Sequence, residues 1–320
     1  MKGTSVRLEE AVRAPRAEIR MHDDWHLAYY ADRSAPGRPL VLVHSINAAP
    51  SSFEVAPLFE HYRARRPVYS LDLPGFGHSE RRDSGYTPER FARAILDLLD
   101  QVVGEPADVL ALSLGAEFAA RAVLMRPGAV DSLALIAPTG FSRRTPPSPG
   151  VGRITHQVLK VPLWSQGLFD LVASRRSIRY YLGRSFVGEP PPEILEYAYA
   201  TSHQPGARHA PLVFLSMQLF TPNARAHLYG RLGELPVLAI ADRDPYIDFD
   251  HLDAFVAEHP RWSRARLAPN MGLPHWERLD ETVAVLDDFW AKRGSLTAVS
   301  DPLSAGARSA ASSRASGFQG

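Results

Sequence analysis

Ser113 is the residue whose surroundings most clearly indicate chemistry. It lies between a run that predicts a buried strand and a run that predicts a helix. A serine on a tight strand-to-helix turn needs small residues two positions to either side, and Ala111 and Gly115 meet this need. Such a turn exposes the hydroxyl and directs the backbone amide of Leu114 toward a developing oxyanion. The alternative is an ordinary serine N-cap, but the order of strand, serine and helix favours a nucleophile.

Asp244 is the candidate acid partner of this serine. It lies just past a predicted strand at Val237–Ile240, and a carboxylate there would orient an imidazole and stabilise its charged form. The alternative is an Asx turn, which any aspartate before a proline such as Pro245 can form. Further aspartates nearby do not predict a calcium site, because Pro245 and Ile247 stand where an EF-hand loop needs glycine and flexible residues.

His275 is the candidate base by elimination among the histidines that follow Asp244. His251 and His259 belong to a predicted helix and its end, which leaves His275 in the loop after the last predicted strand. An imidazole within hydrogen-bond distance of Ser113 would accept the hydroxyl proton.

The elements that must position these residues alternate between short apolar runs and helical patterns. Continuous apolar runs are typical of strands that are buried on both faces of a parallel sheet. The sequence therefore predicts an α/β fold with a mostly parallel, doubly wound sheet, preceded by an antiparallel hairpin. The predicted strands are Ala17–Met21, Trp25–Ala31, Pro39–Val43, Val68–Leu71, Asp108–Leu112, Ser132–Ile136, Val237–Ile240 and Arg264–Leu267. The predicted helices include Phe53–His61, Pro88–Val103, a helix that ends near Met125, Phe249–Glu258 and Glu277–Lys292.

This alternation stops after Pro138. Between Arg143 and about Leu232, prolines separate helix-like segments and no run predicts a strand, so we expect a helical cap inserted into the core. Beyond Gly294 the composition changes to Ser, Ala and Gly, which cannot bury enough apolar surface to order a chain. The predicted organisation is an α/β core of residues 1–142 and 233–294, a helical cap of residues 143–232 and a disordered tail of residues 295–320.

Composition and charge exclude several function classes. The 320 residues are 45% hydrophobic and 22% charged, which is typical of a globular chain. The 36 Lys and Arg are balanced by 35 Asp and Glu, so no net field attracts nucleic acid or an anionic membrane. The chain has no cysteine, which excludes disulfides, thiolate nucleophiles and cysteine-type zinc sites. We find neither an export signal nor an apolar run long enough for a membrane span, and expect a cytoplasmic protein.

From about Ala17 to Gly294 the chain resembles the α/β-hydrolase family. Besides the serine turn, Val41–His44 is similar to the family's third strand and the histidine that ends it. Asp72–Ser79 is similar to the loop that follows the family's fourth strand. A dinucleotide-binding interpretation of this loop fails, because Glu80 stands where the third glycine is needed.

The segment that carries His275 departs from the family pattern of Gly-His, one residue, proline, two residues and glutamate. Alignment on Pro274 and Glu277 puts Gly272 at the histidine position. Alignment on Gly272 implies that one residue has been lost and that His275 comes late. We expect that the shortened loop brings His275 to Ser113. Whether a histidine can act as the base depends on its distance from the serine, and a one-residue change in a loop can move a side chain by several ångströms. In the alternative, the site lacks its general base.

The loop after the third strand departs as well. His44 is followed by Ser45, Ile46 and Asn47, where the family usually has His-Gly. The resemblance still implies an oxyanion hole made by the backbone amides of Ile46 and Leu114. The Ser45 hydroxyl is similar to that of the His-Thr pair in the family's hydroxynitrile lyase branch, which forms no acyl-enzyme. Asn47 would either donate a hydrogen bond to a substrate or cap the following turn.

The resemblance implies a serine hydrolase that cleaves a small or medium apolar ester or related acyl compound through an acyl-enzyme. Ser113, Asp244 and His275 would form its triad, and no cofactor or metal would be needed. The expected partner is a small-molecule substrate, with no nucleic acid and no membrane, and the sequence does not indicate an oligomeric state. Two alternatives stay open: a hydroxynitrile-type lyase, suggested by Ser45, and a catalytically degenerate binding protein, suggested by Gly272.

Overall fold

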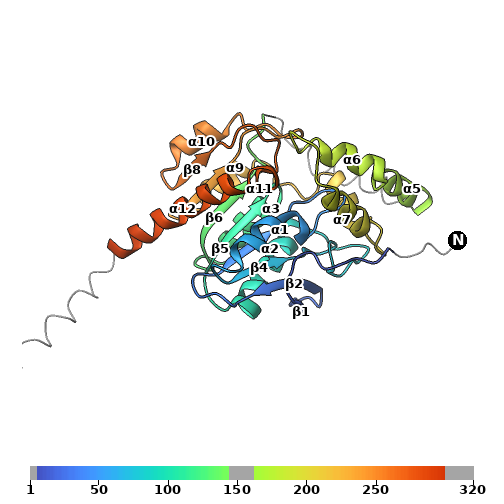
Figure 1. Cartoon of the computed structure of the whole chain (residues 1–320), viewed down its shortest axis with the longest axis horizontal. Coiled ribbons are helices and arrows are strands. Elements are labelled where there is room, and N and C mark those ends of the chain that lie inside the picture. Colours follow the sequence, from blue (N-terminus) through green and yellow to red (C-terminus); the bar gives the residue numbers. More distant parts are fainter. Residues whose placement is uncertain (1–5, 144–161, 300–320) are drawn as a thin grey trace, which may run out of the picture.

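The computed structural model describes residues 6–143 and 162–299, which form an eight-stranded sheet flanked by helices (Figure 1). The spatial order of the strands is β1-β2-β4-β3-β5-β6-β7-β8. β2 pairs antiparallel with β1 and with β4, and every other pair of neighbours in the sheet is parallel. The predicted α/β fold with a mostly parallel sheet and an initial hairpin is confirmed.

Each predicted strand is present, with ends that differ by no more than a few residues. The bounds are β1 Arg16–Arg20, β2 His26–Asp32, β3 Leu40–Val43, β4 Val68–Leu71, β5 Ala107–Leu112, β6 Val130–Ile136, β7 Val237–Ile240 and β8 Trp262–Ala265. All residues of β3, β4, β5 and β7 are buried. Their continuous apolar runs follow from this position, because helices cover both faces of a central parallel strand.

The helix α2 begins and ends at residues that favour helix termini. In α2, the Thr87 hydroxyl accepts a hydrogen bond from the Arg90 amide and Pro88 is the first helical residue. The helix continues as the π-helical turn η2 to Gly104, whose positive φ of 77° ends it. The core elements are η1 Ser52–Val55, α1 Ala56–Tyr62, α2 Pro88–Leu98, η2 Leu99–Val103, α3 Gly115–Met125, α10 Leu252–Glu258, α11 Pro274–Glu277 and α12 Leu279–Val299.

The end of the chain differs from the prediction in two ways. The expected helix Glu277–Lys292 is divided into the single turn α11 and the long helix α12. α12 reaches Val299, five residues beyond Gly294, where we expected order to end. Once a helix has formed, each further residue adds a hydrogen bond at small cost, so a poor composition does not stop it at once. The rest of the predicted tail lies outside the described residues.

Helices replace strands between β6 and β7, as the sequence predicts. The described part of this insertion contains α5 Pro162–Val172, α6 Arg175–Gly183, α7 Pro192–Ser202, α8 His209–Leu215, α9 Ala224–His227 and η3 Tyr229–Arg231. α5, α6 and α7 lie together at one side of the sheet, at the right in Figure 1. We call residues 162–231 the helical insertion. The first part of the predicted cap, residues 144–161, lies outside the described residues, and the exact domain boundaries stay a prediction.

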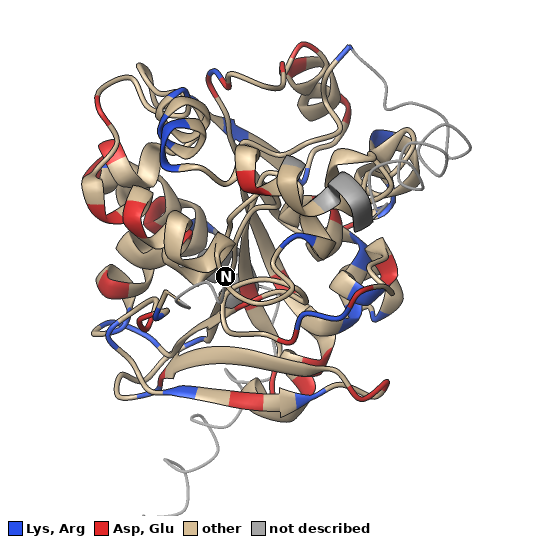
Figure 2. Cartoon of the chain, turned by 90° about the vertical axis from the view of Figure 1, so that its right-hand side faces the viewer, with Lys and Arg blue, Asp and Glu red and all other residues tan. Residues whose placement is uncertain are grey.

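The surface carries both signs of charge. Figure 2 shows Lys and Arg interspersed with Asp and Glu over the helices and the edge of the sheet, as the balanced composition requires. Within the described ranges, no helix is both long enough and apolar enough to cross a bilayer.

Candidate active site

The turn between β5 and α3 holds Ser113 in a strained backbone conformation. Its φ is 49°, in the left-handed region that costs a non-glycine residue about 1–3 kcal/mol. The Ser113 amide donates to the Ile136 carbonyl of β6 (2.9 Å), and its carbonyl accepts from the Ala116 amide (3.1 Å). A Cβ at Gly115 would lie 2.6 Å from the His44 carbonyl oxygen, so only glycine allows this close approach.

Ser113 does not cap the helix that follows it. α3 has Leu114 at its N-cap, and no side chain accepts a hydrogen bond there. Within the described part of the chain, the Ser113 hydroxyl forms no hydrogen bond to another residue. The N-cap alternative from the sequence therefore does not hold, and the strained turn presents a hydroxyl without a partner in the part of the chain that the structure describes.

The oxyanion candidates lie on neighbouring loops. β3 and β5 are adjacent parallel strands, and the chain leaves β3 toward Ile46 and β5 toward Leu114. In open α/β sheets, ligands bind at the carboxyl ends of strands where the strand order reverses, and β3 with its neighbours β4 and β5 is such a place. Among the described residues, neither amide donates a hydrogen bond. Both N–H groups are therefore available to an oxyanion.

The loop after β3 is fixed by a buried carboxylate. Glu54 accepts hydrogen bonds from the Ser45 amide at Oε2 (2.9 Å) and from Asn47 Nδ2 at Oε1 (2.7 Å). Asn47 Nδ2 also donates to the Ser45 hydroxyl (2.9 Å), and Asn47 Oδ1 accepts from the Ala49 amide (2.8 Å). Asn47 thus makes the turn-capping contact that the sequence left open, and its side chain holds the loop.

Asp244 follows β7 in a loop that partly shields its carboxylate. Oδ1 accepts from the amides of Tyr246 (2.8 Å) and Ile247 (3.1 Å), which is the Asx-turn arrangement. Burial raises the pKa of Asp244 to about 6, against the effect of these two hydrogen bonds. Oδ2 of Asp244 faces Gly272. A Cβ added to Gly272 would lie only 2.6 Å from this oxygen.

Gly272 is therefore the residue that the structure places beside the candidate acid. Its φ is 114°, a conformation open to glycine but not to other residues without strain. Its amide donates to Asn270 Oδ1 (2.9 Å). This position agrees with the alignment on Pro274 and Glu277, which puts Gly272 where the family pattern has its histidine.

His275 lies elsewhere, in the single turn α11. Its side chain is 0% exposed, and its Nε2 donates to the Glu54 carbonyl oxygen (2.7 Å). Its Nδ1 is buried and has no hydrogen-bond partner within the described ranges. Burial lowers the pKa of His275 to about 4, so the ring is neutral near pH 7. Among the described residues, His275 hydrogen-bonds neither Ser113 nor Asp244.

The expectation that a shortened loop brings His275 to Ser113 is thus not met in this structure. The physical reason is the helical turn that begins at Pro274. α11 packs against α1 and directs the imidazole to the main chain of Glu54, at the end of η1 that precedes α1. Ser113 and Asp244 lie at their predicted places, after the ends of β5 and β7. The imidazole of His275 does not connect them by hydrogen bonds.

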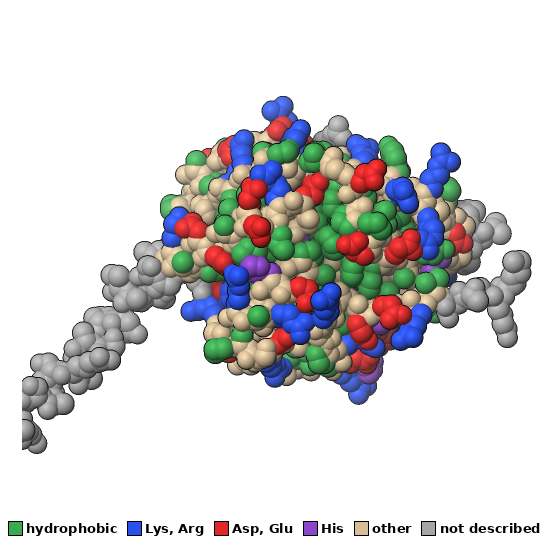
Figure 3. All heavy atoms as spheres, in the orientation of Figure 1, with side chains coloured by type: hydrophobic (Ala, Val, Ile, Leu, Met, Phe, Trp, Pro, Cys, Tyr) green, Lys and Arg blue, Asp and Glu red, His purple; other side chains and the backbone are tan. Residues whose placement is uncertain are grey.

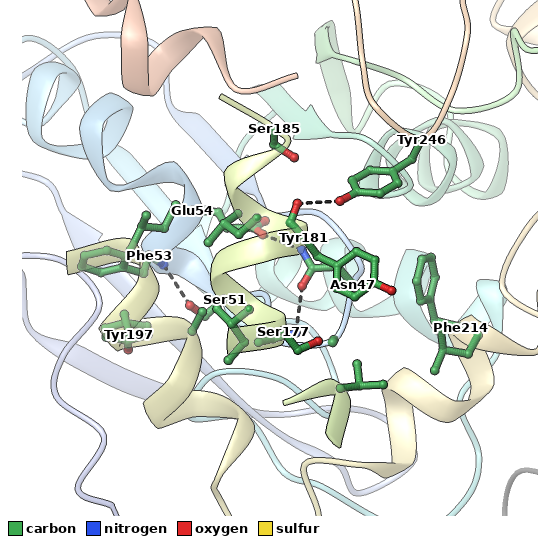
Figure 4. A pocket seen from close by; sticks show the side chains of 18 residues that line it. Asn47, Ser51, Phe53, Glu54, Ser177, Tyr181, Ser185, Tyr197, Phe214 and Tyr246 are labelled. Atoms are coloured by element: carbon green, nitrogen blue, oxygen red, sulfur yellow. Dashed lines mark hydrogen bonds between the residues drawn. The ribbon is translucent and has the colours of Figure 1, made fainter. Parts of the chain in front are cut away.

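A cavity of about 380 Å³ lies between the loop after β3 and the helical insertion (Figure 4). Phe53 stacks on Tyr197 of α7, with ring centroids 4.4 Å apart, and the Tyr246 hydroxyl donates to the Tyr181 carbonyl (2.5 Å). On the face in Figure 3, hydrophobic side chains gather right of centre, where the insertion meets the core. The lining residues are mostly apolar and include Asn47, Phe53, Ile178, Tyr197, Phe214 and Leu215. Ser113 is not among them.

A sequence profile of the alpha/beta hydrolase family matches residues 40–285 of the chain. The chain belongs to the alpha/beta hydrolase family. The match covers β3 to the first part of α12, so it includes the Ser113 turn, the Asp244 loop and the Gly272 segment. The eight-stranded sheet of this alpha/beta hydrolase agrees with that assignment.

Individual relatives of this alpha/beta hydrolase are distant. It is 31% identical over 123 residues to an uncharacterised hydrolase, YugF, of Bacillus subtilis, covering 38% of this chain and 44% of the relative. It is 33% identical over 131 residues to a pimeloyl-[acyl-carrier protein] methyl ester esterase of Methylococcus capsulatus, covering 40% and 48%. The chain thus spans less than half the length of these relatives. The solved enol-lactonase of Burkholderia xenovorans has the same fold, with a TM-score of 0.67, 18% identity and coverage of 86% and 100%.

Two buried carboxylates of this alpha/beta hydrolase were missed by sequence reasoning. Glu54 stands within a predicted helix and Glu117 within the helix after the serine, where a glutamate is usually solvent-exposed. Glu117 accepts from the Thr139 hydroxyl (2.5 Å) and from the Thr221 amide (2.8 Å) of the insertion. Burial raises the pKa of Glu117. No local signal in the sequence distinguishes these residues from surface glutamates.

Proposed function

We propose that the chain is a hydrolase in which Ser113 attacks the carbonyl of a small or medium apolar ester or related acyl compound. The observation that carries this proposal is the left-handed backbone of Ser113, with a hydroxyl that has no partner among the described residues. Strain of this kind persists at sites where function requires it. A serine hydroxyl that served only the fold would cap α3 or bond to a neighbour, and among residues 6–143 and 162–299 the Ser113 hydroxyl does neither.

The cavity and the relatives support the proposed character of the substrate. The cavity beside the loop after β3 is lined mainly by aromatic and aliphatic side chains, which would accommodate an apolar group. The named activities of similar proteins include cleavage of a methyl ester and of an enol-lactone. Both are carbonyl compounds with an oxygen leaving group, which is the chemistry that a serine and two amide donors support.

In the proposed reaction, the Ser113 oxygen forms a bond to the carbonyl carbon and the bond from that carbon to the ester oxygen breaks. The serine proton ends on the departing alcohol, and water then hydrolyses the acyl-enzyme to the acid and free Ser113. The amides of Leu114 and Ile46 would hold the oxyanion. We assign the acid to Asp244. The base role of His275 would require its Nε2 to leave the Glu54 carbonyl, and Asp244 faces Gly272. We therefore propose slow turnover, because a serine without an imidazole is a weak nucleophile.

The test is covalent labelling of the purified protein with a fluorophosphonate, together with hydrolysis of p-nitrophenyl esters of increasing acyl length. We expect labelling at Ser113 that is lost in Ser113→Ala, and ester cleavage that is lost in the same variant. His275→Gln should keep the labelling rate within about threefold, whereas a triad base would change it by about 10⁴-fold. Absence of label on the wild type would overturn the proposal.

A second candidate is a binding protein on the hydrolase fold, and the contact between Gly272 and Asp244 favours it. It predicts that wild type and Ser113→Ala bind an apolar ester equally well in calorimetry and that neither cleaves it. The lyase alternative gains no such support, because Ser45 serves the loop: its hydroxyl oxygen accepts from Asn47 Nδ2 and its amide donates to Glu54. Release of cyanide from a cyanohydrin, with no cleavage of esters, would restore the lyase.

A further inference from the structure

Glu54 connects the two segments in which this chain departs from the family pattern. Its carboxylate holds the loop after β3, where Ser45 stands in place of glycine. Its carbonyl oxygen accepts hydrogen bonds from His275 Nε2 (2.7 Å) and from Trp276 Nε1 (2.8 Å). Glu54 is only 7% exposed, so these contacts are shielded from water.

The two carboxylate contacts lie on either side of Ile46. One oxygen accepts from the Ser45 amide and the other from the Asn47 side chain, so Ile46 is the residue between two fixed points. Hydrogen bonds to an ionised carboxylate are shorter and stronger than neutral ones. The Ile46 amide shares its peptide plane with the Ser45 carbonyl, which accepts a hydrogen bond from His44 Nδ1 (2.6 Å). Glu54 fixes the residues on both sides of this plane, and the Ile46 amide itself donates to no described residue.

The carbonyl contacts explain the buried histidine. A carbonyl oxygen only accepts, so Nε2 of His275 carries the proton and the unpartnered Nδ1 does not. The lowered pKa keeps this ring neutral, and the hydrogen bond to the carbonyl oxygen determines its tautomer. Together with Trp276, His275 holds the main chain of η1 at Glu54, and thereby the side chain that fixes the loop.

We propose that Glu54 is a positioning residue that aims the Ile46 amide at the oxyanion, and that His275 and Trp276 keep Glu54 in place. This role rests on the proposed function, since an oxyanion forms only if Ser113 attacks a carbonyl. The negative charge of Glu54 would by itself oppose a nearby oxyanion. Alignment of the amide must therefore outweigh this repulsion. In a glutamine variant, loss of alignment would lower kcat, whereas loss of the negative charge would raise it.

The experiment compares Glu54→Gln with the wild type. Glutamine has one acceptor oxygen, so it can keep only one of the two contacts to the loop. We expect kcat for a p-nitrophenyl ester to fall by about 10- to 100-fold with KM within threefold, because a small displacement of a catalytic donor is costly. Hydrogen–deuterium exchange of residues 44–49 should become faster. Glu60→Gln in α1, which removes a carboxylate outside the site, is the control and should change neither.

His275 supplies a second comparison. Glutamine at this position can still donate to the Glu54 carbonyl, whereas alanine cannot. We expect His275→Gln to stay near the wild-type kcat and His275→Ala to lose activity and to speed exchange in residues 44–49. Equal losses in both variants would instead indicate a base, and would overturn the proposed role of His275.

The outcomes separate the two proposals. A wild type that neither labels nor hydrolyses esters overturns the proposed function, and the positioning role with it. A wild type that is active, with a Glu54→Gln variant of equal or higher kcat, overturns the positioning role alone. Unchanged exchange of residues 44–49 in Glu54→Gln shows that the carboxylate does not hold the loop, whatever the activity.

Discussion

At the scale of single residues, Gly272 determines what the candidate acid faces. Its positive φ and the absence of a side chain let the backbone lie against Asp244 Oδ2. Any side chain at this position would meet both a strained backbone and an occupied space. The family pattern places a histidine here, so a return to that pattern would require the segment to change its path.

Gly272→Ala tests this contact. The methyl group would lie 2.6 Å from Asp244 Oδ2, and we expect the free energy of unfolding in urea to fall by about 2–4 kcal/mol. Gly104→Ala is the matched control, because its φ is also positive, at 77°, but no atom lies within 4 Å of the added carbon. Gly104→Ala should lower the free energy of unfolding by about 1 kcal/mol. Equal costs in the two variants would show that the Asp244 contact has no weight.

At the scale of elements, Glu117 joins the helix that follows the nucleophile to the insertion. It lies on α3, and its two oxygens accept from Thr139 after β6 and from Thr221 before α9. Arg121 of the same helix also donates to the Thr221 hydroxyl (2.9 Å). The insertion is thus attached at its return segment to the element that fixes Ser113.

Glu117→Ala should loosen this attachment. It leaves the buried Thr221 amide without an acceptor, and each such group costs about 1–3 kcal/mol. We expect the free energy of unfolding to fall by about 2 kcal/mol and hydrogen exchange around residues 216–223 to become faster. Glu89→Ala, which removes an exposed ion pair with Arg121, is the control and should change stability by less than about 1 kcal/mol. A Glu117 variant that matches this control would contradict the prediction.

At the scale of the whole molecule, two buried groups give stability opposite dependences on pH. The pKa of His275 falls from 6.5 to about 4 on folding, so the unfolded state binds a proton first and stability is lost as pH decreases through this window. The pKa of Asp244 rises from 3.8 to about 6, so the folded state keeps its proton longer and stability is lost as pH increases through that window. In the wild type these two effects offset each other between about pH 4 and pH 6.

Single variants should separate the two effects. In Asp244→Asn only the histidine contribution remains, and we expect the unfolding free energy, relative to the wild type, to rise by up to about 2 kcal/mol from pH 4 to pH 6.5. In His275→Gln the unfolding free energy, relative to the wild type, should instead fall over the same pH range, by about 3 kcal/mol. Urea titrations at pH 4.5, 5.5 and 6.5 measure both. Variants that follow the wild-type curve would show that neither group has the shifted pKa.

The sequence by itself determined the sheet, the insertion and the places of Ser113 and Asp244. Strands such as Val68–Leu71 and Val237–Ile240 were predicted with their observed bounds, because a buried parallel strand is a short continuous apolar run. The Ser113 turn was recognisable because it needs small residues at fixed offsets. Both requirements involve residues that are close together along the chain, so both can be recognised in the sequence.

Only the tertiary structure decided which residue faces Asp244 and what His275 does. The sequence allowed two alignments, and the choice between them depends on where α11 packs and which carbonyl its histidine reaches. The role of Glu54 was hidden for the same reason, since its partners lie on segments that are distant along the chain. Contacts between the main chain of one segment and a side chain of another leave no periodic pattern, so they become visible only when the chain is folded.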